Sequence, residues 1–243
     1  MDEPYIRFEG VLAGYKDFMV LNELSFSARR GAITLLLGPN GAGKSTVLKA
    51  LFGLLKPRAG RILLDGQDIV GATQKQLLAR GVAFVPQGRN LFGQLTVWQN
   101  LELGGITLGT KATHERIPPV LELFPRLKER MHSMASSLSG GEQKQLEVGR
   151  ALLLAPKVLL IDEPSIGLSP LVVQDVFRLL RRLADEGTTV LMVEQNVKSA
   201  LKYADEAIAL ESGRLVLQRK AADLLADPHI ERLFLGGAVP ASV

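Results

Sequence analysis

The sequence predicts an α/β protein whose core is a mostly parallel sheet, with an antiparallel β region before it and a helical lobe inserted into it. Short apolar runs, such as AITLLLG at 32–38 and KVLLID at 157–162, are typical of strands buried on both faces. Segments with helical spacing alternate with these runs, which favours parallel strands joined by helices. Between 88 and 137 no β-rich run appears, and leucines mix with charges and prolines, which indicates helices.

The first third of the chain is expected to supply the antiparallel region and the start of the parallel core. Polar and apolar residues alternate over 5–31 between turn signals, and this predicts short antiparallel strands. The sequence then predicts, in order, a buried strand at 32–38, a helix at 45–55, hairpin turns at Gly60 and at Asp65-Gly66, and a buried strand at 81–87.

The remainder of the core follows the helical lobe. It is predicted to contain a helix at 140–155 stopped by Pro156, a strand at 157–162, an amphipathic helix with Val172, Val176, Leu179, Leu180 and Leu183 on one face, a strand at 189–193, a helix capped by Asn196, a hairpin around Ser212-Gly213, and a short helical tail. No internal repeat is present. We expect one domain over 1–243, with the helical lobe at about 88–155 within it.

Composition excludes several classes of protein. Hydrophobic residues make up 47% and charged residues 22% of the 243 residues, close to globular averages. The net charge of +4 is too small to indicate a nucleic-acid-binding face. Cysteine is absent, which excludes disulfides and thiolate chemistry. No apolar run approaches ~20 residues and the first ten lack an apolar core, so we expect neither a membrane span nor a signal peptide.

The stretch GPNGAGKST fits the pattern G-x-x-x-x-G-K-[ST], with a strand before it and a helix after it. Its glycines allow the backbone to turn successive N–H groups toward one point, and the following helix adds its N-terminal dipole. Lys44 supplies a charge for the β- and γ-phosphates, and Ser45 a hydroxyl ligand for Mg²⁺. A chance glycine turn is the alternative, and the strand–helix context argues against it. The expected nucleotide-binding residues are Gly38, Pro39, Asn40, Gly41, Ala42, Gly43, Lys44, Ser45 and Thr46.

A second apolar strand, VLLIDEP, ends in two carboxylates. Burying adjacent acids without partners is costly, whereas a magnesium ion and a water molecule would supply partners. Asp162 is expected to hold the metal's water shell and Glu163 to act as general base toward the attacking water. A pair of acids capping the next helix is the alternative.

The stretch LSGGEQ at 138–143 reads locally as a capping box, with Ser139 as the cap and Glu142 at the third helical position. That interpretation does not explain the Gly-Gly pair or Gln143. A helix that begins at Ser139, Gly140 and Gly141 also exposes free N–H groups, which suit a phosphate. These three residues and Gln143 are therefore expected to bind the nucleotide.

The three motifs GPNGAGKST, LSGGEQ and VLLIDEP, in this order and spacing, resemble the nucleotide-binding subunits of ABC transporters over nearly the whole chain. The resemblance implies a RecA-like P-loop NTPase core, ATP and Mg²⁺ as ligands, and a head-to-tail dimer. Each phosphate loop would then face the other subunit's LSGGEQ motif. Gln87 matches the Q-loop, which senses the metal and the water. Tyr15 matches the aromatic residue that stacks on adenine, with an ordinary strand aromatic as the alternative.

Four further stretches resemble the ATPases of branched-chain amino-acid importers, and in particular the smaller of their two ATPases. They are VPQGRNLFGQLTVWQNL, DEPSIGLSP, MVEQN and LFLGG. This implies integral membrane permease subunits, a second ATPase subunit or a second copy, an extracytoplasmic solute-binding protein, and a peripheral location on the cytoplasmic face of the cell membrane. Urea and short-chain amide importers share this branch. Soluble ABC ATPases acting on DNA, ribosomes or cluster assembly, and export ATPases, remain alternatives.

Several positions depart from the family pattern. Ser169 stands where the family's D-loop usually has an acid, and Trp98 and Gln99 stand where acids are common. Trp98 is either a contact for the membrane subunit or a core aromatic. The role of Glu194 stays open, with local capping or pairing as one reading. The histidines His114, His132 and His229 match no ligand spacing and are expected at the surface.

Gln195 stands where the family has its switch histidine, which makes it the expected γ-phosphate sensor. A carboxamide donates and accepts hydrogen bonds but carries no proton charge near neutral pH, unlike imidazole. We predict that Gln195→Ala lowers the ATPase rate, and that the wild-type sensor shows no imidazole titration. A steady-state ATPase assay of the variant checks this, and intact activity would mean that the sensor role is wrong.

Overall fold

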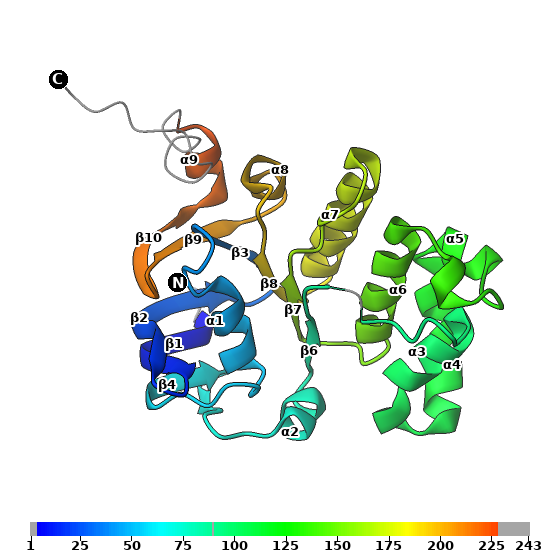
Figure 1. The fold of residues 1–243 in the computed structure, drawn as a ribbon, viewed down its shortest axis with the longest axis horizontal. Coiled ribbons are helices and arrows are strands. Elements are labelled where there is room, and N and C mark those ends of the chain that lie inside the picture. The colour runs from blue at the N-terminus through cyan, green and yellow to red at the C-terminus, as the bar shows by residue number, and fades with distance from the viewer. Residues whose placement is uncertain (1–3, 89, 228–243) are drawn as a thin grey trace.

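The computed structural model describes residues 4–88 and 90–227. Two sheets enclose helix α1, Lys44–Leu51 (Figure 1). The smaller sheet is antiparallel and has the order β2-β1-β4-β5. Its strands are β1 Pro4–Tyr15, β2 Phe18–Arg29, β4 Ala59–Leu64 and β5 Gln67–Asp68. The sequence predicted short strands over 5–31, but β1 and β2 each run for 12 residues, because register shifts let the ladder continue past each irregularity.

The larger sheet has six strands in the order β10-β9-β3-β8-β7-β6. Strands β9, β3, β8, β7 and β6 are parallel, and β10 is an antiparallel edge strand. Their bounds are β3 Ile33–Leu37, β6 Val82–Val85, β7 Val158–Asp162, β8 Thr189–Val193, β9 Glu206–Glu211 and β10 Arg214–Lys220. The predicted fold class is therefore confirmed.

The central strands are buried on both faces, as their apolar runs predict. Along β3, Leu35 and Leu37 pack with helix α7, Pro170–Asp185, and with the helical lobe, whereas Leu36 packs with α1 and the smaller sheet. The same alternation holds in β7 and β8. Val176 and Leu180 of α7 are buried and its other predicted apolar residues pack partly buried against the same core. The strand ends that carry polar residues are thereby held in fixed register.

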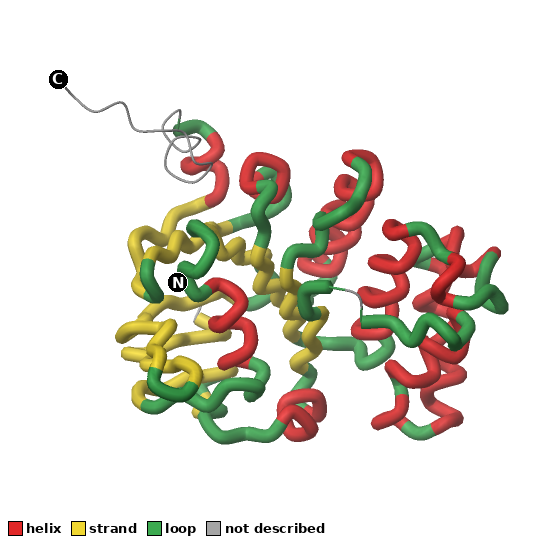
Figure 2. Tube along the Cα trace, in the orientation of Figure 1, coloured by secondary structure: helices red, strands yellow, loops and turns green. Residues whose placement is uncertain are grey.

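Helices occupy the chain between β6 and β7, as the sequence predicts; Figure 2 shows this lobe as a group of helices beside the strands. Its elements are α3 Val97–Gly104, α4 Thr110–Glu122, α5 Pro125–Glu129 and α6 Gly140–Leu152, with 3₁₀ turns at Ile106–Leu108 and Ala135–Ser137. The remaining helices are α2 Gln74–Ala79, α8 Val197–Leu201 and α9 Ala221–Leu225. No helix in the described part of the chain is long and apolar enough to cross a membrane.

Two helices end earlier than the sequence predicts. Helix α1 ends at Leu51 because Gly53 adopts φ 69°, and the Leu54 N–H then closes the helix on the Lys49 carbonyl at 2.8 Å. Helix α6 ends at Leu152, before Ala155 at φ 46°. Pro156 lies beyond this turn, so the chain leaves the helix before the proline requires it.

The β9–β10 hairpin closes one side of the phosphate loop. Its turn is at Ser212-Gly213, as predicted, and both residues have positive φ. The Gly213 N–H donates to the Ala42 carbonyl at 3.0 Å, and its carbonyl accepts from the Asn22 N–H at 2.9 Å. A Cβ at position 213 would lie 1.8 Å from the Val20 carbonyl oxygen, so only glycine fits between β2 and the loop.

Candidate functional site

The phosphate loop connects β3 to α1, as the sequence predicts. Gly38 and Gly43 adopt φ 140° and 101°, respectively. A Cβ on Gly38 would lie 2.2 Å from the Leu210 carbonyl oxygen, and a Cβ on Gly43 would lie 2.9 Å from the Leu21 side chain. Gly43 is also the residue that precedes α1, so no side chain caps the helix. The first N–H groups of α1 are therefore oriented toward the loop, where they suit an anion.

Lys44 is buried under this loop. Its ammonium group donates to the carbonyl oxygens of Gly38 and Pro39, at 2.8 and 3.0 Å. Burial lowers the pKa of Lys44, and the nearby carboxylates of Glu163 and Asp162 act in the opposite direction. The charge is thus held beside the loop, in contact with neutral acceptors that a phosphate group can replace.

Ser45 and Asp162 lie side by side, although 117 positions separate them. The Ser45 hydroxyl donates to Asp162 Oδ1 at 3.1 Å. Burial raises the pKa of Asp162, while the hydrogen bond from Ser45 lowers it. A hydroxyl, a carboxylate and the nearby Gln87 amide oxygen are hard donors of the kind that Mg²⁺ prefers. Mg²⁺ usually keeps waters and phosphate oxygens among its ligands, so a few such protein donors fit it. Within 4–88 and 90–227 there is no group of three or more acidic, histidine or cysteine ligands.

Glu163 lies at the centre of the site and is held from both sides. Its side chain is 6% exposed, and its backbone adopts φ 50°, a strained conformation for a residue other than glycine. Gln87 Nε2 donates to one carboxylate oxygen at 2.5 Å, and Gln195 Nε2 donates to the other at 2.7 Å. The two carboxamides thus fix the direction of a carboxylate that could accept a proton from water.

Glu194 forms hydrogen bonds with neighbouring segments, which agrees with the local pairing that the sequence left open as one interpretation. Its buried carboxylate accepts from the Ser165 N–H and hydroxyl and from the N–H groups of Gln195 and Asn196. Asn196 caps α8 as predicted, since its side chain accepts from the Ser199 N–H. The polar end of β8 therefore combines a helix cap with a carboxylate that binds a neighbouring segment.

A cavity of about 430 Å³ lies over the phosphate loop, within the size range of small-molecule sites. It is lined by Lys44, Gln87, Glu163 and Gln195, together with loop residues and two residues that the sequence reading missed, Phe18 and Val20. The geometry thus brings most of the phosphate-loop residues and the three predicted catalytic side chains to one cavity. Among the predicted site residues, Gly38, Pro39, Ala42 and Asp162 do not line it.

Tyr15 lies beside this cavity. It faces Phe18 directly across the β1–β2 ladder, and its ring centroid lies 6.0 Å from Lys49 Nζ. Both aromatic side chains are exposed, Tyr15 by 46% and Phe18 by 72%. Phe18 could have been found from its position three residues after Tyr15 in a tight hairpin. Stacking of Tyr15 on adenine stays a prediction, and Phe18 is a second candidate for that surface.

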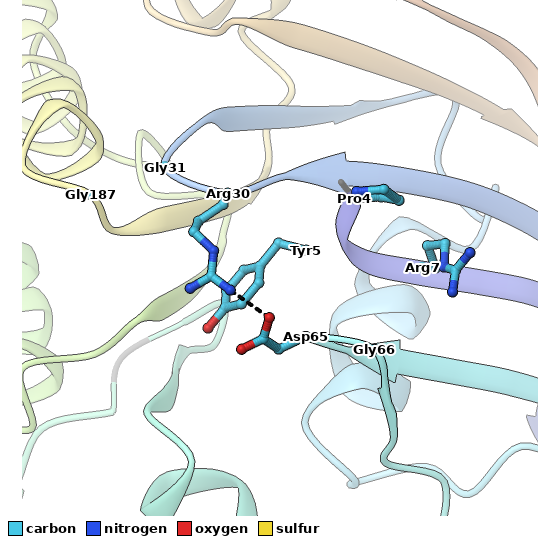
Figure 3. Close-up of a pocket in the computed structure, with 8 residues that line it drawn as sticks. All are labelled: Pro4, Tyr5, Arg7, Arg30, Gly31, Asp65, Gly66 and Gly187. Atoms are coloured by element: carbon cyan, nitrogen blue, oxygen red, sulfur yellow. Dashed lines mark hydrogen bonds and ion pairs between the residues drawn. The ribbon is translucent and has the colours of Figure 1, made fainter. Parts of the chain in front are cut away.

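A larger cavity, of about 640 Å³, is lined by residues from the start of β1, the loop after β2 and the turn between β4 and β5 (Figure 3). Its Arg30 guanidinium lies 3.8 Å from the centroid of the Tyr5 ring and pairs with Asp65 at 2.5 Å. Burial raises the pKa of Tyr5, so its hydroxyl stays neutral. Because its arginine already pairs with Asp65 and no phosphate-loop residue lines it, this cavity does not match the predicted nucleotide site.

The LSGGEQ motif begins α6 in the helical lobe. Ser139 and Glu142 form the predicted capping box, in which the Ser139 oxygen accepts from the Glu142 N–H. Gln143 Nε2 donates to the Ala135 and Leu138 carbonyls, at 3.2 Å each, and so anchors the preceding loop. None of the motif residues lines the cavity over the chain's own phosphate loop, and Figure 1 places α6 apart from α1.

The structure also places the other residues singled out above. Trp98 is half-buried, packs against the core and lies 5.7 Å, between ring centroids, from His114, which agrees with the core interpretation; its contact with a membrane subunit stays a prediction. His114 and His132 are exposed, as predicted. Ser169 is exposed just before α7. His229 and LFLGG lie outside the described residues.

A phosphate loop between a central parallel strand and a helix, faced by two buried carboxylates, defines a P-loop nucleotide-binding protein. Known proteins agree with this. Residues 21–166 match the ABC transporter family. The high-affinity branched-chain amino acid transport ATP-binding protein BraG of Pseudomonas aeruginosa is 43% identical over 232 residues, 96% of this chain and 100% of the relative.

Two further comparisons cover nearly all of the chain. The probable branched-chain amino acid transport ATP-binding protein LivF of Archaeoglobus fulgidus is 38% identical over 92% of this chain and 95% of its own length. A solved ATP-binding cassette of an ABC transporter, in its ADP conformation, superposes with a TM-score of 0.86 at 28% identity, covering 96% of this chain and 99% of that one. The chain belongs to the ABC transporter family, and it is an ATP-binding ATPase subunit of that family.

Asp162→Asn tests the metal assignment. Because burial raises the pKa of Asp162, the ionised form destabilises the nucleotide-free protein as the pH rises through that pKa, and the neutral amide removes this cost. We expect the variant's nucleotide-free Tm to stay unchanged or rise. In the wild type, MgATP at 100 times its Kd should raise the free energy of unfolding by about 2.7 kcal/mol, which corresponds to a rise in Tm of roughly 5–10 °C. ATP with a chelator should give a smaller rise in Tm.

In Asp162→Asn, MgATP and chelated ATP should raise the Tm by the same amount, as measured by thermal denaturation. Asp175→Asn is the matched control, since Asp175 is half-exposed on α7 and pairs with Arg178. A metal-dependent rise in Tm as large in Asp162→Asn as in the wild type would contradict the assignment of Asp162 to the metal site.

Proposed function

We propose that this ATPase energises the import of branched-chain or related hydrophobic amino acids through a membrane permease. The observation that supports ATP hydrolysis is the position of Glu163. Hydrogen bonds from Gln87 and Gln195 fix its carboxylate in the cavity that is also lined by Lys44. The amino-acid assignment is supported by similarity to two branched-chain amino acid transport ATP-binding proteins over nearly the full chain.

In the proposed reaction, water attacks the γ-phosphorus of ATP while Glu163 accepts its proton, and the bond to the β–γ bridging oxygen breaks to release ADP. Lys44 exchanges its two carbonyl acceptors for phosphate oxygens, and the first N–H groups of α1 stabilise negative charge on them. Ser45, Asp162 and Gln87 would hold Mg²⁺, which supplies further charge neutralisation when bound. Gln195 donates to the γ-phosphate.

The phosphate-binding end of α6 needs a second subunit. Ser139, Gly140 and Gly141 lie at a helix N-terminus away from the chain's own loop, and exposed Ile166 and Leu171 lie on the segment next to it. We infer a head-to-tail dimer with a second ABC ATPase subunit or a second copy, in which this end of α6 contacts the partner's ATP.

The helical lobe is suited to transmit the nucleotide state to a permease. The Asn90 N–H donates to Glu147 of α6 at 2.7 Å, and Arg150 of α6 donates to the Asn90 carbonyl at 2.6 Å. A neighbouring groove of about 340 Å³ is lined by apolar residues that include Phe84 and Ile106. We propose that the permease docks in this groove, at the cytoplasmic face of the cell membrane, with an extracytoplasmic solute-binding protein as an indirect partner and no nucleic acid involved.

The direct test is transport in vesicles that contain the complete complex. Leucine uptake that depends on ATP inside the reconstituted system supports the proposal. Uptake of urea or short amides alone would assign the same machinery to another solute, and outward movement would make it an exporter. Co-purification with ribosomes or DNA in place of a permease would instead favour a soluble ABC ATPase.

Glu163→Gln separates binding from hydrolysis. The amide keeps the volume but cannot accept the proton, so the ATPase rate of the complex should fall roughly 10²- to 10⁴-fold. ATP affinity, measured with a fluorescent analogue, should stay within a few-fold of the wild type. The control is Glu186→Gln, because Glu186 is an exposed carboxylate just after the end of α7 and pairs with Arg182. Near-normal turnover in Glu163→Gln would contradict the role of Glu163.

A further inference from the structure

Glu194 accepts hydrogen bonds from two segments that meet beside the catalytic cavity. One oxygen accepts from the Ser165 N–H at 2.7 Å. The other accepts from the Ser165 hydroxyl at 2.8 Å and from the N–H groups of Gln195 and Asn196 at 2.9 and 3.1 Å. The side chain is 2% exposed, so these donors replace the water that an ionised carboxylate requires.

The contact lies where main-chain pairing between β7 and β8 stops. The last hydrogen bond runs from the Glu163 N–H to the Val193 carbonyl at 2.9 Å. Glu163 then turns to φ 50°, so the strand cannot continue. Glu194 extends the connection beyond that point, because its carboxylate binds Ser165 on one side and the Gln195 backbone on the other. The Glu194 side chain thus adds a further link between the segments that carry Glu163 and Gln195.

The same segment reaches the helical lobe. A Cβ placed on Gly140 would lie 3.7 Å from the Gly167 carbonyl oxygen, two residues beyond Ser165. The start of α6 therefore lies against the segment that Glu194 holds. A shift at Ser165 would move the contact with α6 and the sensor turn together.

We infer that Glu194 is a positioning residue, which holds the Gln195 carboxamide against Glu163 by joining the turn after β8 to the segment after β7. This inference rests on the proposed roles of Glu163 and Gln195. Glu194 is not among the residues that line the cavity. It therefore acts through Gln195 and does not contact ATP.

Glu194→Gln is the informative substitution. It keeps the length of the side chain but replaces one acceptor oxygen with an NH₂ group, which must then face either the Ser165 N–H or the Gln195 and Asn196 N–H groups. Ser165→Ala is milder, because it removes only the hydroxyl donor and leaves the backbone bond to Glu194.

The experiment measures kcat, KM for ATP and the affinity of a fluorescent ATP analogue in the complete transporter complex. In Glu194→Gln, kcat should fall roughly 10- to 100-fold, since small misplacements of catalytic groups have effects of this size. KM and affinity should stay within about twofold, because the phosphate loop is untouched. Ser165→Ala should lower kcat by a smaller factor. Glu122→Gln, on the exposed face of α4, is the control.

The decisive step is a double-mutant cycle with Gln195→Ala. If Glu194 acts through Gln195, Glu194→Gln and Ser165→Ala should cause no further loss of kcat once the carboxamide is gone. An equal fold-loss in both backgrounds, or wild-type kcat in both single variants, would overturn the inference. Should Glu194→Gln fail to fold, Ser165→Ala in the two backgrounds decides. Normal turnover in Glu163→Gln would refute the proposed base itself, which is a separate outcome from any result of the cycle.

Discussion

Three carboxylates buried near one edge of the parallel sheet constrain the rest of the site. Asp162, Glu163 and Glu194 are each less than a tenth exposed, and an ionised carboxylate at such depth requires hydrogen-bond donors. The donors come from different segments: Ser45 from α1, Gln87 from the end of β6, Gln195 from the end of β8, and Ser165 from the segment after β7. Satisfying these acids therefore assembles the site.

The sheet makes this assembly reproducible. Parallel strands β3, β8, β7 and β6 are buried on both faces, so their register is fixed by packing on two independent apolar clusters. Their polar ends consequently meet at one edge, the usual ligand-binding edge of such sheets. The chain enters the helical lobe just after Gln87 at this edge, and the start of α6 lies against the segment that follows β7.

Much of the fold was predictable because its signals are local. The glycine pattern at 38–46 and the capping box at Ser139 require only neighbours in sequence, and both appear in the structure. Helix ends were predicted less well, since Gly53 and Ala155 end helices through positive φ, which apolar periodicity does not show.

The contacts within the site were not predictable in the same way. The pairing of Gln87 and Gln195 with the two oxygens of Glu163 spans 76 and 32 positions. The partners of Glu194 likewise depend on where the chain turns after β7. Phe18 was missed because its place beside Tyr15 in the hairpin, the one sequence signal for it, does not by itself reveal the cavity that it lines. Long-range geometry, and not residue type, decides these roles.

The most direct test of the account is a structure of the complex with ADP, Mg²⁺ and a vanadate mimic of the γ-phosphoryl group. We expect a carboxylate oxygen of Glu163 to lie about 2.6–3.2 Å from the oxygen in the attacking position. We also expect Gln195 Nε2 to donate a hydrogen bond to the mimic. A structure in which Glu163 points away from that oxygen, with another side chain in its place, would contradict the central claim.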